Sequence, residues 1–134
     1  MKRLLIALSV LALNGCALYD AYMMTGFDSN EYRIIAEIRT EAGAYKTSCN
    51  NPLMSATNST AMAEKTRLFM LYSEHIPKNT NVYNASKNLD AIAQGLAAKY
   101  KETAPVSPVF CKLKYESIES SANAMQTIIG KRPR

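Results

Sequence analysis

The sequence feature that most constrains the fold is a helical spacing of apolar residues that recurs along the chain. The clearest case is residues 85–102, where apolar side chains follow one another at intervals of three and four. They are Leu89, Ile92, Ala93, Leu96, Ala97 and Tyr100. This spacing places them on one face of an α-helix, whereas a half-buried strand needs alternation, and no convincing alternating stretch occurs. The pattern predicts an all-α protein.

Three further segments share this spacing, so we expect helices over residues 30–48, 60–75, 85–102 and 109–129. Asp28 followed by Glu31 resembles a capping box at the start of the first helix. The intervening segments 49–59, 77–84 and 103–108 contain proline and turn-forming residues and are expected to be loops. Four helices with loops of this length predict a four-helix bundle-like domain. The expected inward residues are Ile35, Ile38, Ala42, Tyr45, Met62, Leu68, Phe69, Leu71, Tyr72, Ile76, Phe110, Leu113, Ile118, Ala122, Met125 and Ile129.

The N-terminus has the features of an export signal. Lys2 and Arg3 precede an apolar run, residues 4–13, in which Ser9 is the single polar residue. A membrane-spanning helix needs about 20 apolar residues, whereas the apolar core of a secretory signal has about 7 to 15. The run therefore predicts export and not a membrane span.

The residues that follow decide the type of signal. Leu13, Asn14, Gly15 and Cys16 resemble the lipobox of bacterial lipoproteins, which signal peptidase II cleaves before the cysteine. The resemblance implies lipid transfer to the Cys16 sulfur, removal of residues 1–15 and acylation of the new amino group, with palmitate as the expected chain. In the sorting rule of this family, Ala17 favours the outer membrane. The alternative is an ordinary secretory signal with an incidental cysteine.

This interpretation divides the chain into a signal peptide (1–15), a lipidated N-terminus and linker (16–29) and one helical domain (30–134). Of the three cysteines, Cys49 and Cys111 then remain as a pair in an oxidising compartment, which favours a disulfide. The alternatives are a bond between two chains, a metal pair or a reactive thiol. In an up-down bundle, Cys49 and Cys111 would lie at the same end, so the bridge would join the first helix to the last.

Motifs for chemistry are sparse in this sequence. The single histidine, His75, is expected near a helix C-terminus, and the sequence has no phosphate-binding loop, no metal-ligand spacing and no nucleophile motif. We therefore expect no enzyme, no catalytic residue, no cofactor and no metal. The net charge of +5 is not accompanied by a nucleic-acid-binding pattern. The basic ending, residues 131–134, is expected either to stabilise the end of the last helix or to contact an anionic surface, with Arg134 in solvent.

The sequence thus favours a non-catalytic envelope lipoprotein, held on the periplasmic face of the outer membrane by lipid. Its helical domain would bind or bridge an envelope protein or the cell wall. Small phage-encoded lipoproteins, either outer spanin-like lysis proteins or superinfection-exclusion proteins, are an alternative. A small periplasmic enzyme or ligand carrier with a dispersed site is a further one.

Overall fold

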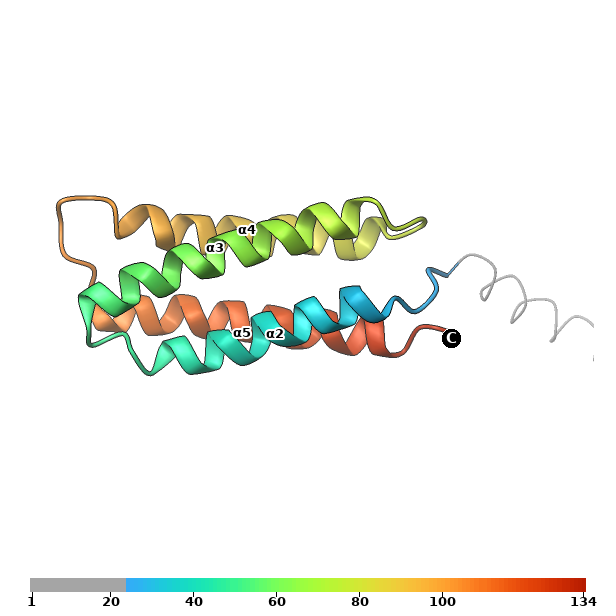
Figure 1. The fold of residues 1–134 in the computed structure, drawn as a ribbon, viewed down its shortest axis with the longest axis horizontal. Helices are drawn as coiled ribbons and strands as arrows, with labels where there is room; N and C mark the ends of the chain where they lie inside the picture. The colour runs from blue at the N-terminus through green and yellow to red at the C-terminus, as the bar shows by residue number, and fades with distance from the viewer. Residues whose placement is uncertain (1–23) are drawn as a thin grey trace, which may run out of the picture.

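The computed structural model describes residues 24–134, which form a bundle of four antiparallel α-helices (Figure 1). The helices are α2 (Ser29–Lys46), α3 (Pro52–Glu74), α4 (Thr80–Lys99) and α5 (Pro108–Gly130). α2 packs most extensively on α5, and α3 on α4, so the bundle consists of two helix pairs. The prediction of an all-α, four-helix domain is confirmed.

Different segments of the chain lie at the two ends of the bundle. Residues 24–28, the α3–α4 connection and residues 131–134 lie together at one end, which we name the terminal end (Figure 1). The α2–α3 and α4–α5 connections lie at the opposite end, which we name the disulfide end.

Three of the helices begin at a side-chain cap. The Glu31 backbone N–H donates to Asp28 Oδ1 over 2.7 Å, which confirms the first half of the expected capping box. Asn51 caps α3 in the same way, with Pro52 in the first turn, and Ser107 caps α5. Proline suits this position because the first-turn N–H groups have no helical partner.

Two of the expected loops are partly helical. α3 begins at Pro52, so most of the segment 49–59 is helix, and α4 begins at Thr80 inside the segment 77–84. The early turns of α3 face the core with Ser55 and Ser59, both fully buried. Their hydroxyls donate to the carbonyl oxygens of Ser48 (2.9 Å) and Ala56 (2.8 Å). Bonded hydroxyls are compatible with burial, but they carry no apolar signal in the sequence.

The inward face of α3 differs in part from the expected one: Met62 and Phe69 are buried as expected, but residues with hydroxyl groups share that face. Ser55, Ser59, Met62, Thr66, Phe69 and Ser73 are buried on it. Leu68 and Leu71, which we expected to point inward, are 55% and 47% exposed, and Leu113 of α5 is 57% exposed. Ser55, Ser59, Thr66 and Ser73 were not expected to point inward, because the prediction considered apolar residues alone. The expectations for Ile35, Ile38, Ala42, Ile118, Ala122, Met125 and Ile129 are confirmed by their burial.

Small and polar side chains line much of the contact between α3 and α4. The buried Thr66 hydroxyl donates to Asp90 Oδ1 over 3.1 Å, and the Gln94 side-chain amide donates to the Ala63 carbonyl over 3.0 Å. Gly95 does not contribute a close approach, since a Cβ atom there would meet open space. Hydrogen bonds between the helices therefore accompany apolar packing within this pair.

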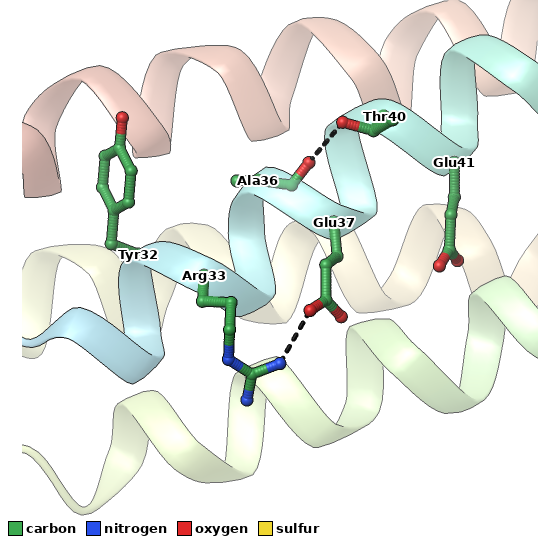
Figure 2. A pocket seen from close by; sticks show the side chains of 6 residues that line it. All are labelled: Tyr32, Arg33, Ala36, Glu37, Thr40 and Glu41. Atoms are coloured by element: carbon green, nitrogen blue, oxygen red, sulfur yellow. Dashed lines mark hydrogen bonds and ion pairs between the residues drawn. The ribbon is translucent and has the colours of Figure 1, made fainter.

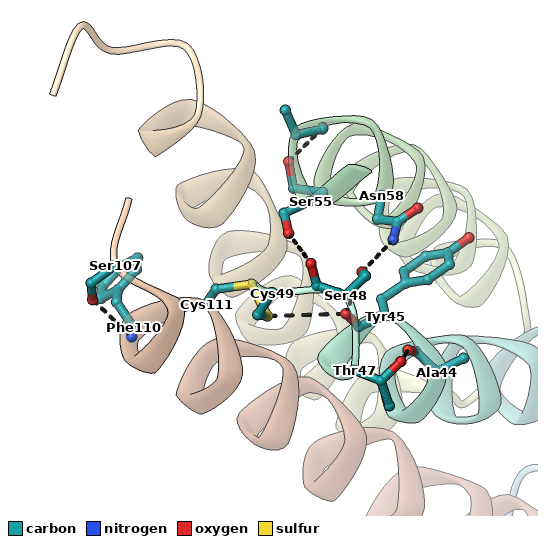
Figure 3. The surroundings of a disulfide bond; sticks show 12 residues. Ala44, Tyr45, Thr47, Ser48, Cys49, Ser55, Asn58, Ser107, Phe110 and Cys111 are labelled. Atoms are coloured by element: carbon teal, nitrogen blue, oxygen red, sulfur yellow. Dashed lines mark hydrogen bonds between the residues drawn. A yellow bond between two sulfur atoms is a disulfide. The ribbon is translucent and has the colours of Figure 1, made fainter. Parts of the chain in front are cut away.

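The disulfide end is closed by a bond between Cys49 and Cys111, with a Cα–Cα distance of 5.8 Å (Figure 3). It joins the segment after α2 to the first turn of α5, and both cysteines are buried. Beside it, the Asn58 side-chain amide of α3 donates to Ser48 Oγ over 2.9 Å. The bond lies within one chain, so the predicted pairing is confirmed.

We predict that changing both Cys49 and Cys111 to Ser lowers the free energy of unfolding while the helical circular dichroism stays near native. The bridge joins residues 62 apart. The chain-entropy model gives about 4 kcal/mol for such a loop, most of it through the unfolded chain. Urea unfolding monitored by circular dichroism measures the loss, with reduced native protein as the comparison. An unchanged unfolding midpoint in both samples would contradict this assignment of the bridge.

Candidate functional site

A buried polar cluster lies at the terminal end of the bundle, and each helix or its flanking turn contributes one member. The Glu31 carboxylate of α2 accepts three hydrogen bonds from other parts of the chain. The donors are Ser73 Oγ of α3 (2.9 Å), Asn79 Nδ2 at the start of α4 (2.6 Å) and Arg132 Nη1 after α5 (2.5 Å). Arg132 Nη2 also donates to Asn79 Oδ1 over 2.6 Å. We name these four residues the Glu31 cluster.

Burial of the Glu31 cluster determines what it can do. The Glu31 side chain has no exposed surface, and that of Arg132 is 6% exposed. A substrate cannot reach a carboxylate without exposed surface, so the arrangement is not that of an open acid–base site. Withdrawing two charges from water carries a desolvation cost that good geometry and further hydrogen bonds offset. The chemistry of the cluster is therefore structural, and it fixes four chain segments relative to one carboxylate.

The position of Arg132 corrects the expectation for the basic tail. We expected residues 131–134 to stabilise the helix end or to contact an anionic surface, but Arg132 points into the bundle. Pro133 continues this docking, because its carbonyl accepts a hydrogen bond from the Phe27 N–H over 2.8 Å. The Arg134 guanidinium lies 4.9 Å from the centroid of the Phe27 ring. The tail and the segment before α2 thus hold each other at the terminal end.

A shallow groove about 460 Å³ in volume runs along the outer face of α2 (Figure 2). Its charged lining residues are already paired, since Arg33 Nη1 donates to Glu37 Oε1 over 2.7 Å. Lys65 of α3 forms ion pairs with both Glu37 and Glu41. The hydrogen bond from Arg33 holds the pKa of the Glu37 carboxyl below its ordinary value; burial opposes this shift and Lys65 adds to it. Such ionised, paired carboxylates suit a solvated helix face better than a proton-transfer site.

A second groove, about 520 Å³, lies on the α3 side of the terminal end. It is lined mainly by Leu68, Leu71, Tyr72, His75, Ile76 and Pro77. His75 follows the end of α3, as expected, with Nδ1 3.0 Å from the Leu71 carbonyl oxygen. Asp28, which also faces this groove, accepts from the Tyr72 hydroxyl and caps α2. The groove is mostly apolar, and its histidine has a contact within its own helix.

Three further expectations concern the lipidation site, a metal ion and a membrane span. Cys16, the expected lipidation site, lies outside the described residues. Within residues 24–134, no group of histidine, cysteine or acidic side chains is arranged to hold a metal ion. In the same range, no helix is both long enough and apolar enough to cross a membrane.

Burial raises the pKa of the Tyr115 hydroxyl far above its usual range, so that hydroxyl stays protonated.

The Glu31 cluster was missed at the level of sequence, although part of it had a signal. Glu31 precedes Ile35, Ile38 and Ala42 at the helical spacing of four, three and four, so it falls on the buried stripe of α2. We interpreted it as a local capping residue instead. Arg132 has no comparable signal, because its partner is 101 positions away in the sequence.

Comparisons with known proteins do not assign the chain to a protein family: no family model, no curated protein and no solved structure matches it.

We predict that Arg132→Met lowers the free energy of unfolding by about 3 to 5 kcal/mol, because it leaves the Glu31 carboxylate buried without its cation. Lys131→Met is the matched control, since Lys131 is the exposed neighbour at the end of α5 and should change stability by less than about 1 kcal/mol. Chemical denaturation of both variants measures the difference. Equal, small losses in the two variants would show that the Glu31 cluster contributes little.

Proposed function

We propose that this protein is a non-catalytic lipoprotein of the outer membrane whose helical domain binds or bridges another component of the cell envelope. The observation that carries the proposal is the sequence Leu13–Asn14–Gly15–Cys16 after a short apolar run. The described disulfide supports it, because Cys49 and Cys111 bond each other and leave Cys16 outside the pair. A cysteine that this disulfide does not use, placed in a lipobox-like sequence, is suited to lipid attachment.

The absence of an enzyme site is part of this proposal, and the arrangement of ionisable groups supports it. The Glu31 carboxylate is occluded by three donors, and the carboxylates of the α2 groove pair with Arg33 and Lys65. Catalytic acids and bases generally combine access to substrate with a pKa adjusted to their task. A role in binding and positioning fits these residues better than one in catalysis.

The disulfide end supplies a surface for the partner. Four large apolar side chains are exposed there: Leu53 and Met54 in the first turn of α3, and Val109 and Leu113 on either side of Cys111. Leu53 is 81% exposed and Val109 is 67% exposed. Val109 and Leu113 lie one helical turn apart on α5, and exposed apolar residues gathered in this way are typical of interaction sites. The bridge at Cys111, between them in the sequence, would hold this part of α5 rigid. The surface lies at the opposite end from residues 24–28, which favours a bridging role.

The Cys49–Cys111 disulfide lies within one chain, and this distinguishes the two phage alternatives. A disulfide-linked dimer would have favoured an outer spanin-like lysis protein, but Cys49 and Cys111 are occupied by each other. A superinfection-exclusion lipoprotein that blocks a receptor remains compatible with a lipid-anchored domain and an exposed apolar end. Isolation of the lipidated protein together with its partner would distinguish a receptor from a component of the cell wall.

We predict that Cys16→Ser abolishes lipid labelling and releases the protein from outer-membrane fractions, because serine offers no thiol to the lipid transferase. The matched control is Ala17→Asp, which keeps the thiol and, under the sorting rule of the family, should move a lipidated protein to the inner membrane. Membrane fractionation after a salt wash, with metabolic fatty-acid labelling, reads both outcomes. A serine variant that still fractionates with outer membranes would refute the lipid anchor.

A further inference from the structure

The terminal end of the bundle exposes apolar side chains on two sides. On the α4–α5 side, Met24 and Ile128 line a groove of about 220 Å³ and are 50% and 56% exposed. On the α3 side, Leu68, Leu71 and Ile76 line the larger groove already described. We name these five residues the apolar collar. α3 and α5 are diagonal in the bundle, since each packs on α2 and α4, so the collar occupies opposite faces of one end.

The length of chain before Met24 limits where this end can be. Eight peptide steps separate Cys16 from Met24, and a fully extended chain covers about 28 Å over that distance. A helix of 23 residues, such as α5, is about 35 Å long. A lipid on Cys16 would therefore hold the terminal end near the bilayer, closer than the length of the bundle itself. The apolar collar lies at the end that such a lipid would hold there.

We propose that the terminal end rests on the phospholipid surface, with the apolar collar in the interfacial layer and the bundle axis directed away from the membrane. This inference rests on the proposed lipid anchor and adds a second contact to it. Binding of a protein to an interface strengthens with buried apolar area and with attraction to anionic lipids. The exposed cations Lys131 and Arg134 lie at this end and favour anionic headgroups, partly offset by Glu74 and by Asp28 in the α3-side groove.

The placement of the collar favours a lipid surface over a protein partner. A folded protein that docks along one side of the bundle would leave either the Leu71 side or the Ile128 side exposed. A membrane perpendicular to the bundle axis meets both sides together. The terminal position of Met24, Ile76 and Ile128 is consistent with end-on contact, because each lies at or beyond the end of a helix.

Tryptophan scanning tests the proposal directly, because the chain contains no tryptophan. Ile128→Trp and Leu71→Trp place a probe on each side of the collar. Leu113→Trp and Met54→Trp are matched controls, since they lie on the same two helices at the disulfide end with similar exposure. The lipidated full chain is reconstituted in vesicles of phosphatidylethanolamine and phosphatidylglycerol, with and without brominated acyl chains. Circular dichroism verifies the fold of each variant.

The expected result for Ile128→Trp and Leu71→Trp is a blue shift of the emission and loss of intensity to the brominated lipid, with neither effect for the controls. Quenching of the probe on one side alone would mean that one side face of the bundle, and not its end, meets the lipid, which overturns the proposal. Equal quenching of collar and control probes would mean that the bundle lies flat, which also overturns it. The intact mass of the floated protein reports lipidation separately. Protein that carries lipid but shows no quenching contradicts this inference alone, whereas protein without lipid contradicts the anchor on which it rests.

Discussion

The arrangement of the terminal end depends on one buried carboxylate. Glu31 has no contact with solvent, and an ionised carboxylate in that position needs a cation and further donors. Arg132, Asn79 and Ser73 supply them, and each belongs to a different part of the chain. The Glu31 carboxylate thus fixes the positions of three segments: the end of α3, the start of α4 and the C-terminal tail. A capping function alone would have left Glu31 at the surface and these segments without a common partner.

The two ends of the bundle are held by different chemistry. At the disulfide end, a covalent bond joins the segment after α2 to α5 and acts mainly by restricting the unfolded chain. At the terminal end, the Glu31 cluster acts in the folded state and unites all four helices. Between the two ends, buried hydroxyls such as those of Ser59 and Ser86 donate to carbonyl groups of their own helix. The bundle therefore combines an apolar core with polar contacts whose hydrogen bonds are made internally.

The sequence predicted the architecture but not the polar contacts. Helical spacing was sufficient for the existence of four helices, and an even pair of cysteines after Cys16 was sufficient for the bridge. The starts of α3 and α4 were missed because Asn51, Pro52 and Asn79 resemble loop residues. Asn51 caps α3 through its side chain, whereas the Asn79 side chain bonds Glu31 and Arg132 and makes no cap hydrogen bond. Leu71 and Leu113 were assigned inward because apolar character was equated with burial. The Glu31–Arg132 contact depends on the tertiary structure, and no local pattern contains it.

A double-mutant cycle between Glu31 and Arg132 measures how strongly this ion pair holds the terminal end together. Glu31→Gln and Arg132→Met should each destabilise the domain strongly, because each leaves a buried charge without its partner. The double variant should then lose less than the two single losses combined, with a coupling free energy above about 1 kcal/mol, as expected for residues in direct contact. Additive losses, measured by urea unfolding of all four proteins, would contradict the claim that this ion pair closes the terminal end.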